Sequence, residues 1–340
     1  MKFGELRIGK ASGSILAHTL KVRKQTFRKG RILSEDDLKS LVEAGFDTVV
    51  VVTLEKEDIH ENTAAQRLAR AITGTNLSLS PTATGRCNLI AEVDGLVLID
   101  SKTINDLNLT NEVIAISTVS PFKQVSKGDV VATVKIITFG VAQSIIVECE
   151  KITKQNSIPI NVSQFSTKKI GLIQTTLPVL KKKLLEKTRE VTKKRISDLG
   201  STFIHEEICE HDVSKVSRAI KRCYDNDCEV VLIIGASAIA DRCDVLPKAV
   251  EECGGKINHF GLPVDPGNLM LLAEMNSMIV LGLPGSARSP RLHGFDWILQ
   301  RLLADINVEG KDLMLMGVGG LLKDIPGRPL PRKRAVQSKI

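Results

Sequence analysis

Residues 229–249 read EVVLIIGASAIADRCDVLPKA, which joins an apolar run, a loop of small residues and the start of a helix. The run Val230–Ile234 has no polar interruption, which is typical of a strand that is buried on both faces of a sheet. Asp244 precedes Pro247 by three residues, and an aspartate before an early proline is a common helix start. The segment therefore predicts a strand, a loop and a helix in succession.

The same alternation extends over the second half of the chain. Apolar runs predict further strands, and amphipathic runs between them predict helices. The strands are expected at 169–174, 201–205 and 278–283, and the helices at 178–199, 212–224, 244–253 and 290–306. This pattern predicts an α/β domain at residues 165–330 with a three-layer, mostly parallel sheet. Ligands bind such sheets beyond the carboxyl ends of the strands.

The first half of the chain is expected to hold two smaller regions. Residues 1–80 predict a small α/β region, with helices at 34–44 and 58–71 and a strand at 48–54. Residues 81–152 predict a β-rich region, with strands at 95–99, 113–118, 130–137 and 144–149. The polar stretch 153–168 predicts a linker, and residues 331–340 predict a basic tail.

Composition narrows the function classes. Lys and Arg total 47 against 39 Asp and Glu, a formal charge of +8, which suits an anionic ligand without requiring one. Aromatic residues make up 3%, too few for base-stacking surfaces, so no nucleic-acid partner is expected. The cysteines form no CxxC pair, which favours a reduced, cytoplasmic protein over a zinc or disulfide framework. No long apolar run is present, so no membrane partner is expected.

Several enzyme motifs are missing from the sequence. It contains no HExxH, GxSxG or GxxxxGK[ST] segment, so metalloprotease, hydrolase and P-loop interpretations lose their main signals. The histidines have no ligand spacing, and core or surface roles are expected for them. His259 and His293 flank the loops described next, so these two could hydrogen-bond a ligand.

Two glycine-containing loops follow predicted strands. The loop after Ile234 carries the carboxylates of Asp241 and Asp244, and the loop after Leu283 carries hydroxyls and the cation Arg288. Carboxylates bind Mg²⁺ and arginine pairs with phosphate, so the two loops together suit a phosphorylated ligand with a divalent metal. An ordinary strand-to-helix turn, capped by Asp244, remains the alternative for the first loop.

The second half resembles the molybdopterin-binding domain of the molybdopterin molybdotransferases and adenylyltransferases, the MoeA and MogA type. Three segments carry the resemblance: GASAIADRCDVLP at 235–247, PVDPGNL at 263–269 and GLPGS at 282–286. The strand IGLIQTT at 170–176 resembles the opening strand of that domain, and KGRILSEDDLKSLVEAGFDTVVV at 29–51 resembles, more loosely, a molybdotransferase segment ahead of it.

The resemblance implies a ligand and a set of site residues. The ligand would be molybdopterin or molybdenum cofactor, with Mg²⁺ as a candidate metal held by Asp241. Asp241 and Asp244 would be the catalytic carboxylates. The implied binding residues are Thr175, Thr176, Gly235, Ser237, Pro266, Gly267, Asn268, Gly282, Pro284, Gly285, Ser286, Arg288 and Ser289.

This chain departs from the family pattern at three positions. Ala236 stands in place of the second glycine of the first turn, and Ala287 in place of the proline after GLPGS. Asn268 replaces a lysine, which removes a phosphate-pairing charge that Arg288 could supply from the adjoining loop. Binding is therefore better supported than catalysis.

Three functions stay open at this point. The first is an enzyme of molybdenum cofactor biosynthesis that inserts molybdate or transfers a nucleotide. The second is a non-catalytic cofactor carrier that serves a nucleotidyltransferase or a molybdoenzyme partner. The third is a generic nucleotide-binding regulatory protein, because fold does not determine function. Self-association into a homo-oligomer is also left open.

The basic segment 178–196 is expected to be a structural helix. Its apolar residues Val179, Leu180, Leu184 and Val191 are predicted to form the buried stripe, with the lysines in water.

Overall fold

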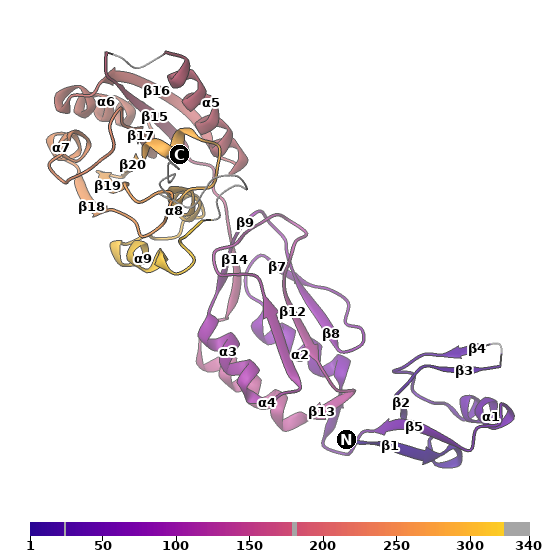
Figure 1. Cartoon of the computed structure of the whole chain (residues 1–340). Coiled ribbons are helices and arrows are strands. Elements are labelled where there is room, and N and C mark those ends of the chain that lie inside the picture. Colours follow the sequence, from indigo (N-terminus) through magenta and orange to yellow (C-terminus); the bar gives the residue numbers. More distant parts are fainter. Residues whose placement is uncertain (24, 179–181, 323–340) are drawn as a thin grey trace, which may run out of the picture. The chain divides into compact units, whose positions relative to one another are not determined.

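The computed structural model describes residues 1–23, 25–178 and 182–322, and the chain divides into two compact units, Met1–Gln164 and Phe165–Ile340 (Figure 1). Both units combine helices with β-sheets, so the chain is a mixed α/β protein. The predicted basic tail at 331–340 lies outside the described residues. The predicted boundary near residue 80 falls within the first unit.

The first unit begins with a three-stranded antiparallel sheet made by β1 (Lys2–Arg7), β5 (Thr48–Thr53) and β2 (Ile15–Leu16). A hairpin of β3 (Leu20–Val22) and β4 (Gln25–Phe27) and a short turn, η1 (Ile8–Lys10), accompany it. Helix α1 (Glu35–Glu43) starts at Ser34, whose hydroxyl accepts from the Asp37 amide while the Asp37 carboxylate accepts from the Ser34 amide. This reciprocal cap explains why the helix begins there.

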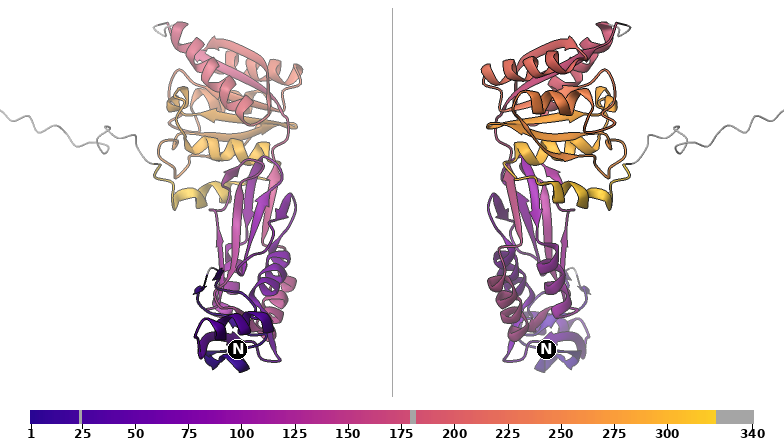
Figure 2. Two further views of the ribbon diagram at one scale, coloured as in Figure 1. Left: turned by 90° about the vertical axis from the view of Figure 1, so that its right-hand side faces the viewer. Right: turned by 90° about the vertical axis from the view of Figure 1, so that its left-hand side faces the viewer.

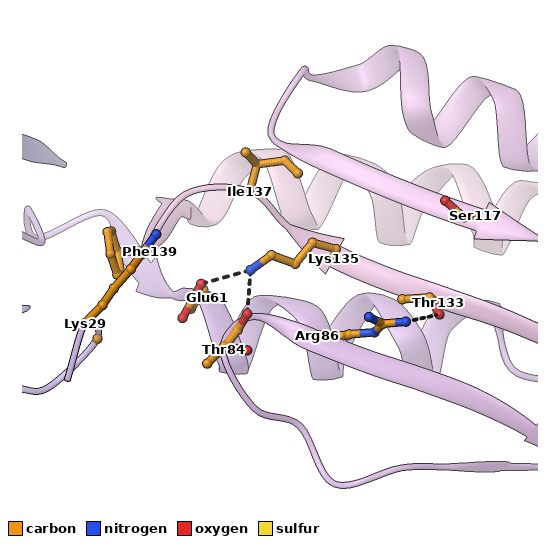
Figure 3. Close-up of a pocket in the computed structure, with 10 residues that line it drawn as sticks. Lys29, Glu61, Thr84, Arg86, Ser117, Thr133, Lys135, Ile137 and Phe139 are labelled. Atoms are coloured by element: carbon orange, nitrogen blue, oxygen red, sulfur yellow. Dashed lines mark hydrogen bonds and ion pairs between the residues drawn. The ribbon is translucent and has the colours of Figure 1, made fainter. Parts of the chain in front are cut away.

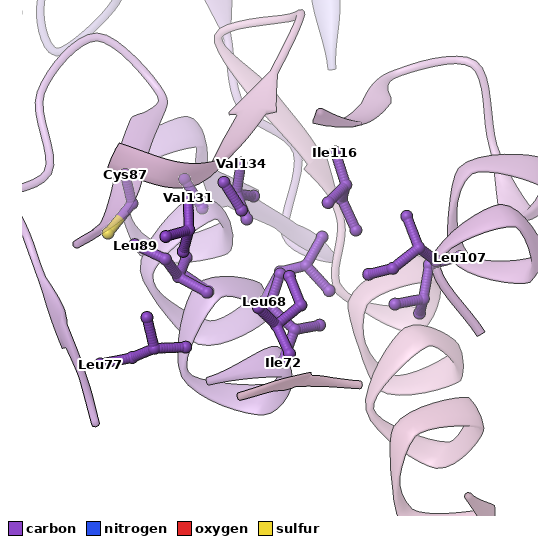
Figure 4. Packing of buried hydrophobic residues seen from close by; sticks show 14 of the residues in the cluster. Leu68, Ile72, Leu77, Cys87, Leu89, Leu107, Ile116, Val131 and Val134 are labelled. Carbon is purple, nitrogen blue, oxygen red and sulfur yellow. The ribbon is translucent and has the colours of Figure 1, made fainter. Parts of the chain in front are cut away.

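The rest of the first unit surrounds one large apolar core (Figure 4). Helix α2 (Glu61–Ile72) buries Ala64, Leu68 and Ile72 against Leu89 and Val134 of the sheet, so this core extends across the predicted boundary near residue 80. A four-stranded sheet has the order β10 (Ile114–Thr118), β12 (Val130–Ile136), β8 (Arg86–Ala91) and β7 (Leu77–Leu79). A three-stranded sheet has the order β11 (Gln124–Val125), β9 (Gly95–Ile99) and β14 (Ile160–Gln164). A two-stranded sheet pairs β13 (Gly140–Ala142) with β6 (Asp58–His60).

Two predictions for this part of the chain are wrong. The segment 144–149 is not a strand, because it lies in the helix α4 (Gln143–Gln155), which follows α3 (Ser101–Thr110) in the chain. The buried residues Ile146, Cys149 and Thr153 recur every three or four residues, which is a helical period. The stretch 153–168 is also more than a linker, because β14 within it pairs with β9.

The second unit is built on a six-stranded sheet in the order β16 (Thr202–Glu210), β15 (Lys169–Thr176), β17 (Val230–Ile234), β20 (Met278–Leu283), β19 (Leu271–Met275) and β18 (Lys256–Phe260). The first four strands are parallel neighbours, whereas β19 is antiparallel to both β20 and β18. The prediction missed β18 and β19, because both are short and contain polar residues. A mostly parallel arrangement thus holds for part of this sheet, and the other sheets are antiparallel.

Helices pack on both faces of the six-stranded sheet (Figure 2). On one face, α5 (Lys182–Asp198) and α8 (Gly294–Leu303) contribute Ile196 and Phe295 to an apolar cluster. On the other face, α6 (Val213–Asp225) and α7 (Val245–Glu252) contribute Ile220 and Val250 to a second cluster. Strand β17 is buried at every residue, as expected for the centre of such a sheet. The short segments η2 (Gly285–Arg288), α9 (Gly310–Met314) and η3 (Leu315–Gly317) complete the unit.

The buried face of α5 differs from the predicted one. The helix buries Leu185, Thr188, Thr192 and Ile196, while Leu184 is exposed. Thr188 can be buried because its hydroxyl donates to the Leu184 carbonyl at 2.7 Å, which satisfies the polar group inside the helix. A stripe that contains threonines is missed when only apolar residues are counted. Val179 and Leu180, also predicted to be buried, lie outside the described residues.

Candidate functional site

The carboxyl ends of β15, β17 and β20 lie next to one another, because these strands are parallel neighbours. Strand β19 runs the opposite way and pairs Leu271 with Gly282, so the loop before β19 opens at the same edge. We call this region, formed by residues 175–176 and the loops 235–244, 261–270 and 284–293, the carboxyl edge. All three segments that resemble the molybdopterin-binding family have residues in it.

Thr175 links two strand ends at the carboxyl edge. Its side-chain oxygen accepts a hydrogen bond from the Ala236 amide at 2.7 Å and lies 2.8 Å from Nδ1 of His211. The single hydroxyl proton of Thr175 can point at the ring, so Thr175 donates to Nδ1 when the neutral imidazole carries its proton on Nε2, and it accepts from Nδ1 in the other neutral tautomer. Burial lowers the pKa of His211, and the nearby carboxylate of Asp244 opposes this in part. The neutral ring is therefore the main form at pH 7.

Two glycines at this edge have packing roles. A Cβ at Gly235 would lie 2.5 Å from the Ser237 carbonyl oxygen, so the tight turn after β17 needs a glycine. Gly282 lies inside β20, where a Cβ would lie 2.8 Å from Ile239 and 2.9 Å from Leu271. Its missing side chain lets the loop after β17 pack against the sheet, which is a different role from ligand contact.

Arg288 carries a half-buried charge at the carboxyl edge. One guanidinium nitrogen, Nη1, donates to Gln174 Oε1 at 3.3 Å and to Thr188 Oγ1 at 2.9 Å, and Nη2 donates to the Gly235 carbonyl at 3.1 Å. Burial lowers the pKa of Arg288, but a guanidinium stays charged at neutral pH. Among the described residues no carboxylate forms an ion pair with it. Its positive charge is thus available to an anion.

Arg195 of α5 anchors the loop that carries Arg288. Its guanidinium donates to the carbonyls of Ala287, at 2.7 Å, of Ser289, and of Arg291, at 2.9 Å. Its Nε also forms an ion pair with Asp296 Oδ1 at 3.0 Å. Burial raises the pKa of Asp296 and lowers that of Arg195, so both charges depend on the pairing. Arg195 therefore positions this loop of the carboxyl edge through its backbone carbonyls.

The two aspartates of the first loop differ in their surroundings. Asp244 is the N-cap of α7, as predicted, and its two oxygens accept from the amides of Val245, at 2.7 Å, and Ala240, at 3.1 Å. Asp241 is exposed, and its Oδ1 accepts from the Cys243 amide at 2.7 Å. This hydrogen bond is the largest of the effects that lower the pKa of Asp241. Asp241 is the better placed of the two to bind a cation.

The metal prediction can be compared with the donors present. Within the described ranges, no three His, Cys, Asp or Glu side chains come together to hold a metal ion. Mg²⁺ commonly takes one or two carboxylates and completes its shell with water and substrate phosphates. The exposed Asp241 fits such a role only when a phosphorylated ligand supplies further oxygens.

The segment 263–269 is tied to the start of α8. The Pro266 carbonyl accepts from the Gly294 amide at 3.0 Å, and a Cβ at Gly267 would lie 2.8 Å from that same nitrogen. Gly267 has a φ of +141°, so a side chain there would be strained as well as crowded. The Asn268 side chain donates to the Leu262 carbonyl at 3.2 Å and closes the turn.

The remaining predicted binding residues are spread along the carboxyl edge. Thr176 donates to the Cys209 carbonyl at 3.2 Å, so its hydroxyl is used inside the sheet. Ser289 Oγ accepts weakly from the Arg291 amide at 3.4 Å. Pro284 is buried, whereas Ser237, Gly285 and Ser286 are exposed and face solvent.

Sequence reasoning missed Gln174, Arg195 and His211, which position the predicted residues. The predicted strand ends in three polar residues, Gln174 to Thr176, and this pattern could have marked Gln174 as a site residue. His293, expected to have a core or surface role with a ligand contact as the alternative, is buried, and its Nδ1 lies 2.6 Å from the Arg291 carbonyl. His259 lies in β18, and its ring would be 3.1 Å from a Cβ at Gly310.

Over the part of the chain that the structure describes, we find no helix with the length and apolar character needed to cross a bilayer.

Comparisons with known proteins give a partial picture. Residues 5–53 match a family described as a domain of unknown function (DUF8806), and no curated protein matches the chain. Among solved structures, the molybdopterin biosynthesis MoeA protein from Pyrococcus horikosii is similar at 14% identity and a TM-score of 0.33, over 89% of this chain and 75% of that one.

Two further solved structures are similar over a smaller part of this chain. The tungsten cofactor synthesizing protein MoaB from Pyrococcus furiosus has 14% identity and a TM-score of 0.28, covering 40% of this chain and 91% of its own. The protein CinA, of unknown function, from Thermoplasma acidophilum has 12% identity and a TM-score of 0.29, covering 42% and 99%. Values this low indicate no more than a partial likeness in fold.

Proposed function

We propose that the second unit binds molybdopterin or molybdenum cofactor at the carboxyl edge, and that the protein takes part in the biosynthesis of that cofactor. The observation that carries the proposal is the Arg288 guanidinium. It is half-buried, held by three neutral acceptors and unpaired with any described carboxylate. A buried charge without a partner is costly, and a bound anion would offset that cost.

A phosphate is the anion that suits this place best. Arginine recognises phosphate through two parallel N–H donors, and exposed Ser286 lies two residues before Arg288 in the same loop. The choice of a pterin phosphate over other phosphates is supported by the three sequence segments that resemble the molybdopterin-binding family. All three have residues at the carboxyl edge, although they are far apart in sequence.

A carrier role is favoured over a catalytic one by the two aspartates. Both oxygens of Asp244 accept backbone hydrogen bonds, which leaves Asp241 as the carboxylate available for Mg²⁺. Molybdate insertion or nucleotidyl transfer would rely on that exposed group together with ligand phosphates, since positioning and charge neutralisation drive such chemistry. A carrier needs only the Arg288 charge and the shape of the edge.

The test is co-purification from a host that produces molybdopterin. The full chain is purified, treated with an oxidant and examined for the fluorescence of the oxidised pterin. We expect a pterin signal near one equivalent per chain from the wild type and a strongly reduced signal from Arg288→Met. Lys123→Met, a change of the same kind at an exposed lysine in the first unit, is the matched control and should keep the signal.

Two results would contradict the proposal. One is the absence of any pterin from wild-type protein that is folded and made in the producing host. The other is an equal pterin content in wild type and folded Arg288→Met, because the ligand would then not depend on the carboxyl edge.

A further inference from the structure

The first unit contains a second basic site, a pocket of about 720 Å³ on the four-stranded sheet (Figure 3). Strand β12 sends Val134 and Ile136 into the apolar core, while the alternate residues Thr133 and Lys135 are only partly buried. The pocket lies on this outer side of the sheet, because side chains alternate between the two faces of a strand. It shares no residue with the carboxyl edge.

The strand register places two cations opposite each other in this pocket. Arg86 on β8 pairs with Lys135 on β12, and Ser117 on β10 pairs with Thr133. Like charges in directly opposed positions destabilise a sheet. The two head groups relieve this repulsion by leaning apart along the strands, Arg86 toward Asn88 and Lys135 toward Thr84 (Figure 3). Both side chains line the same pocket, so its wall carries positive charge at two places.

Lys135 is held in place by the turn before β8. Its Nζ donates to the Thr84 carbonyl and lies 3.4 Å from Glu61 Oε2. Gly85 has a φ of +67°, and a Cβ there would lie 2.6 Å from that Glu61 oxygen and 2.9 Å from Lys135 Nζ. The same Cβ would lie 2.9 Å from the Ile136 carbonyl oxygen, so the backbone of this turn favours a glycine. The turn carries the Thr84 carbonyl to which the Lys135 ammonium group donates.

The other two cations of the pocket have no carboxylate partner among the described residues. Arg86 donates to Asn88 Oδ1 at 3.1 Å and to Thr133 Oγ1 at 3.4 Å, which are both neutral acceptors. Lys29 lies over the ring of Phe139, with Nζ 5.1 Å from its centroid. With Glu61 as the single acidic lining residue, three cations face one carboxylate.

We propose that this pocket binds a small organic phosphate, with the phosphate on Arg86 and Lys135 and the uncharged part against Phe139. Arginine and lysine both bind phosphate, the first through paired donors and the second as a point charge. The volume lies in the range of sites for small organic ligands. Phe139 and Ile137 supply the apolar wall that an inorganic ion would not use.

The experiment is calorimetric titration of the full chain with adenosine monophosphate, and separately with inorganic phosphate. We expect saturable binding of the nucleotide with a dissociation constant below about 1 mM, and weaker binding of inorganic phosphate. Arg86→Gln should raise the dissociation constant about tenfold or more, the loss expected for a charge-assisted hydrogen bond. Arg70→Gln, which removes an exposed arginine from α2 in the same unit, is the matched control and should bind like wild type.

Thr133→Val is the second variant, since it removes one of the two acceptors that hold Arg86 but keeps all charges. It should weaken binding less than Arg86→Gln does, and thermal unfolding of each variant verifies that it is folded. Failure of the wild type to bind the nucleotide overturns the proposal, as does equal binding by folded Arg86→Gln. Loss of binding in Arg288→Met alone would assign the phosphate to the second unit. Tight binding of a single-stranded oligonucleotide without binding of the mononucleotide would indicate a nucleic-acid surface instead.

Discussion

Replacing Arg288 by methionine tests two roles of this side chain, its hydrogen bonds within the protein and its proposed binding of a phosphate. Methionine keeps much of the length of arginine but removes the charge and all five donors. In the ligand-free protein the change leaves Gln174 Oε1 without its Arg288 partner, and that oxygen belongs to a fully buried side chain. Thr188 and the Gly235 carbonyl lose an Arg288 hydrogen bond as well.

These losses set the expected change in stability. An unsatisfied buried acceptor costs about 1–3 kcal/mol. The variant also lacks the desolvation cost of the half-buried charge, which offsets part of this loss. We therefore expect Arg288→Met to lower the free energy of unfolding by about 1–2 kcal/mol, measured by urea denaturation. Arg288→Lys keeps the charge, so it should restore part of the binding but little of the lost hydrogen bonding.

The expected change in ligand affinity is larger and independent of folding. Loss of charge-assisted hydrogen bonds to a phosphate should weaken pterin binding by about 1.5–3 kcal/mol, which is roughly a factor of 10 to 150 in the dissociation constant. Fluorescence titration with molybdopterin under anaerobic conditions measures this value at a temperature where the variant is folded. An unchanged dissociation constant in folded Arg288→Met would refute the placement of the phosphate.

Three further predictions follow from the geometry. Burial lowers the pKa of His211 below its usual 6.5, so the folded protein favours the neutral ring. The contribution of His211 to stability is present above pH 6.5 and is lost as the pH falls through the lowered pKa. The free energy of unfolding should therefore depend less on pH in His211→Asn. Asp241→Asn should preserve folding and pterin binding but abolish any Mg²⁺-dependent turnover with molybdate or a nucleotide. Asp244→Asn loses one of two accepted hydrogen bonds, so it should lower the free energy of unfolding by about 1 kcal/mol in urea denaturation. Reversal of Lys182 and Lys193 to Glu should leave pterin affinity unchanged in the same titration and lower stability by about 1 kcal/mol or less, mainly through the contact of Lys193 with the Phe203 ring.

Much of the second unit can be predicted from sequence, because its central strands are buried on both faces. Strands β17 and β20 have the predicted bounds, and helix α7 begins after the predicted cap, Asp244. Their signals are local: an uninterrupted apolar run and a capping side chain. Strands β18 and β19 lack such runs and are stabilised by pairing with β20 and with each other, which a local pattern cannot reveal.

The candidate site is only partly predictable for a related reason. Gly235, Arg288 and the aspartates stand in loops whose composition marks them. Gln174, Arg195 and His211 act through partners that are distant in sequence: Arg195 contacts carbonyls more than ninety residues away. Packing decides which arginine keeps a charge without a carboxylate partner and which one anchors the loop backbone. Packing also gives α5 a buried stripe with two threonines.

A crystal structure of the full chain with molybdopterin is the most direct test of the proposed function. The proposal predicts that the pterin phosphate lies within hydrogen-bond distance of the Arg288 guanidinium, with Ser286 and the turn at Gly235 beside the ligand. An ordered pterin bound elsewhere, including the pocket of Arg86 and Lys135, would contradict it.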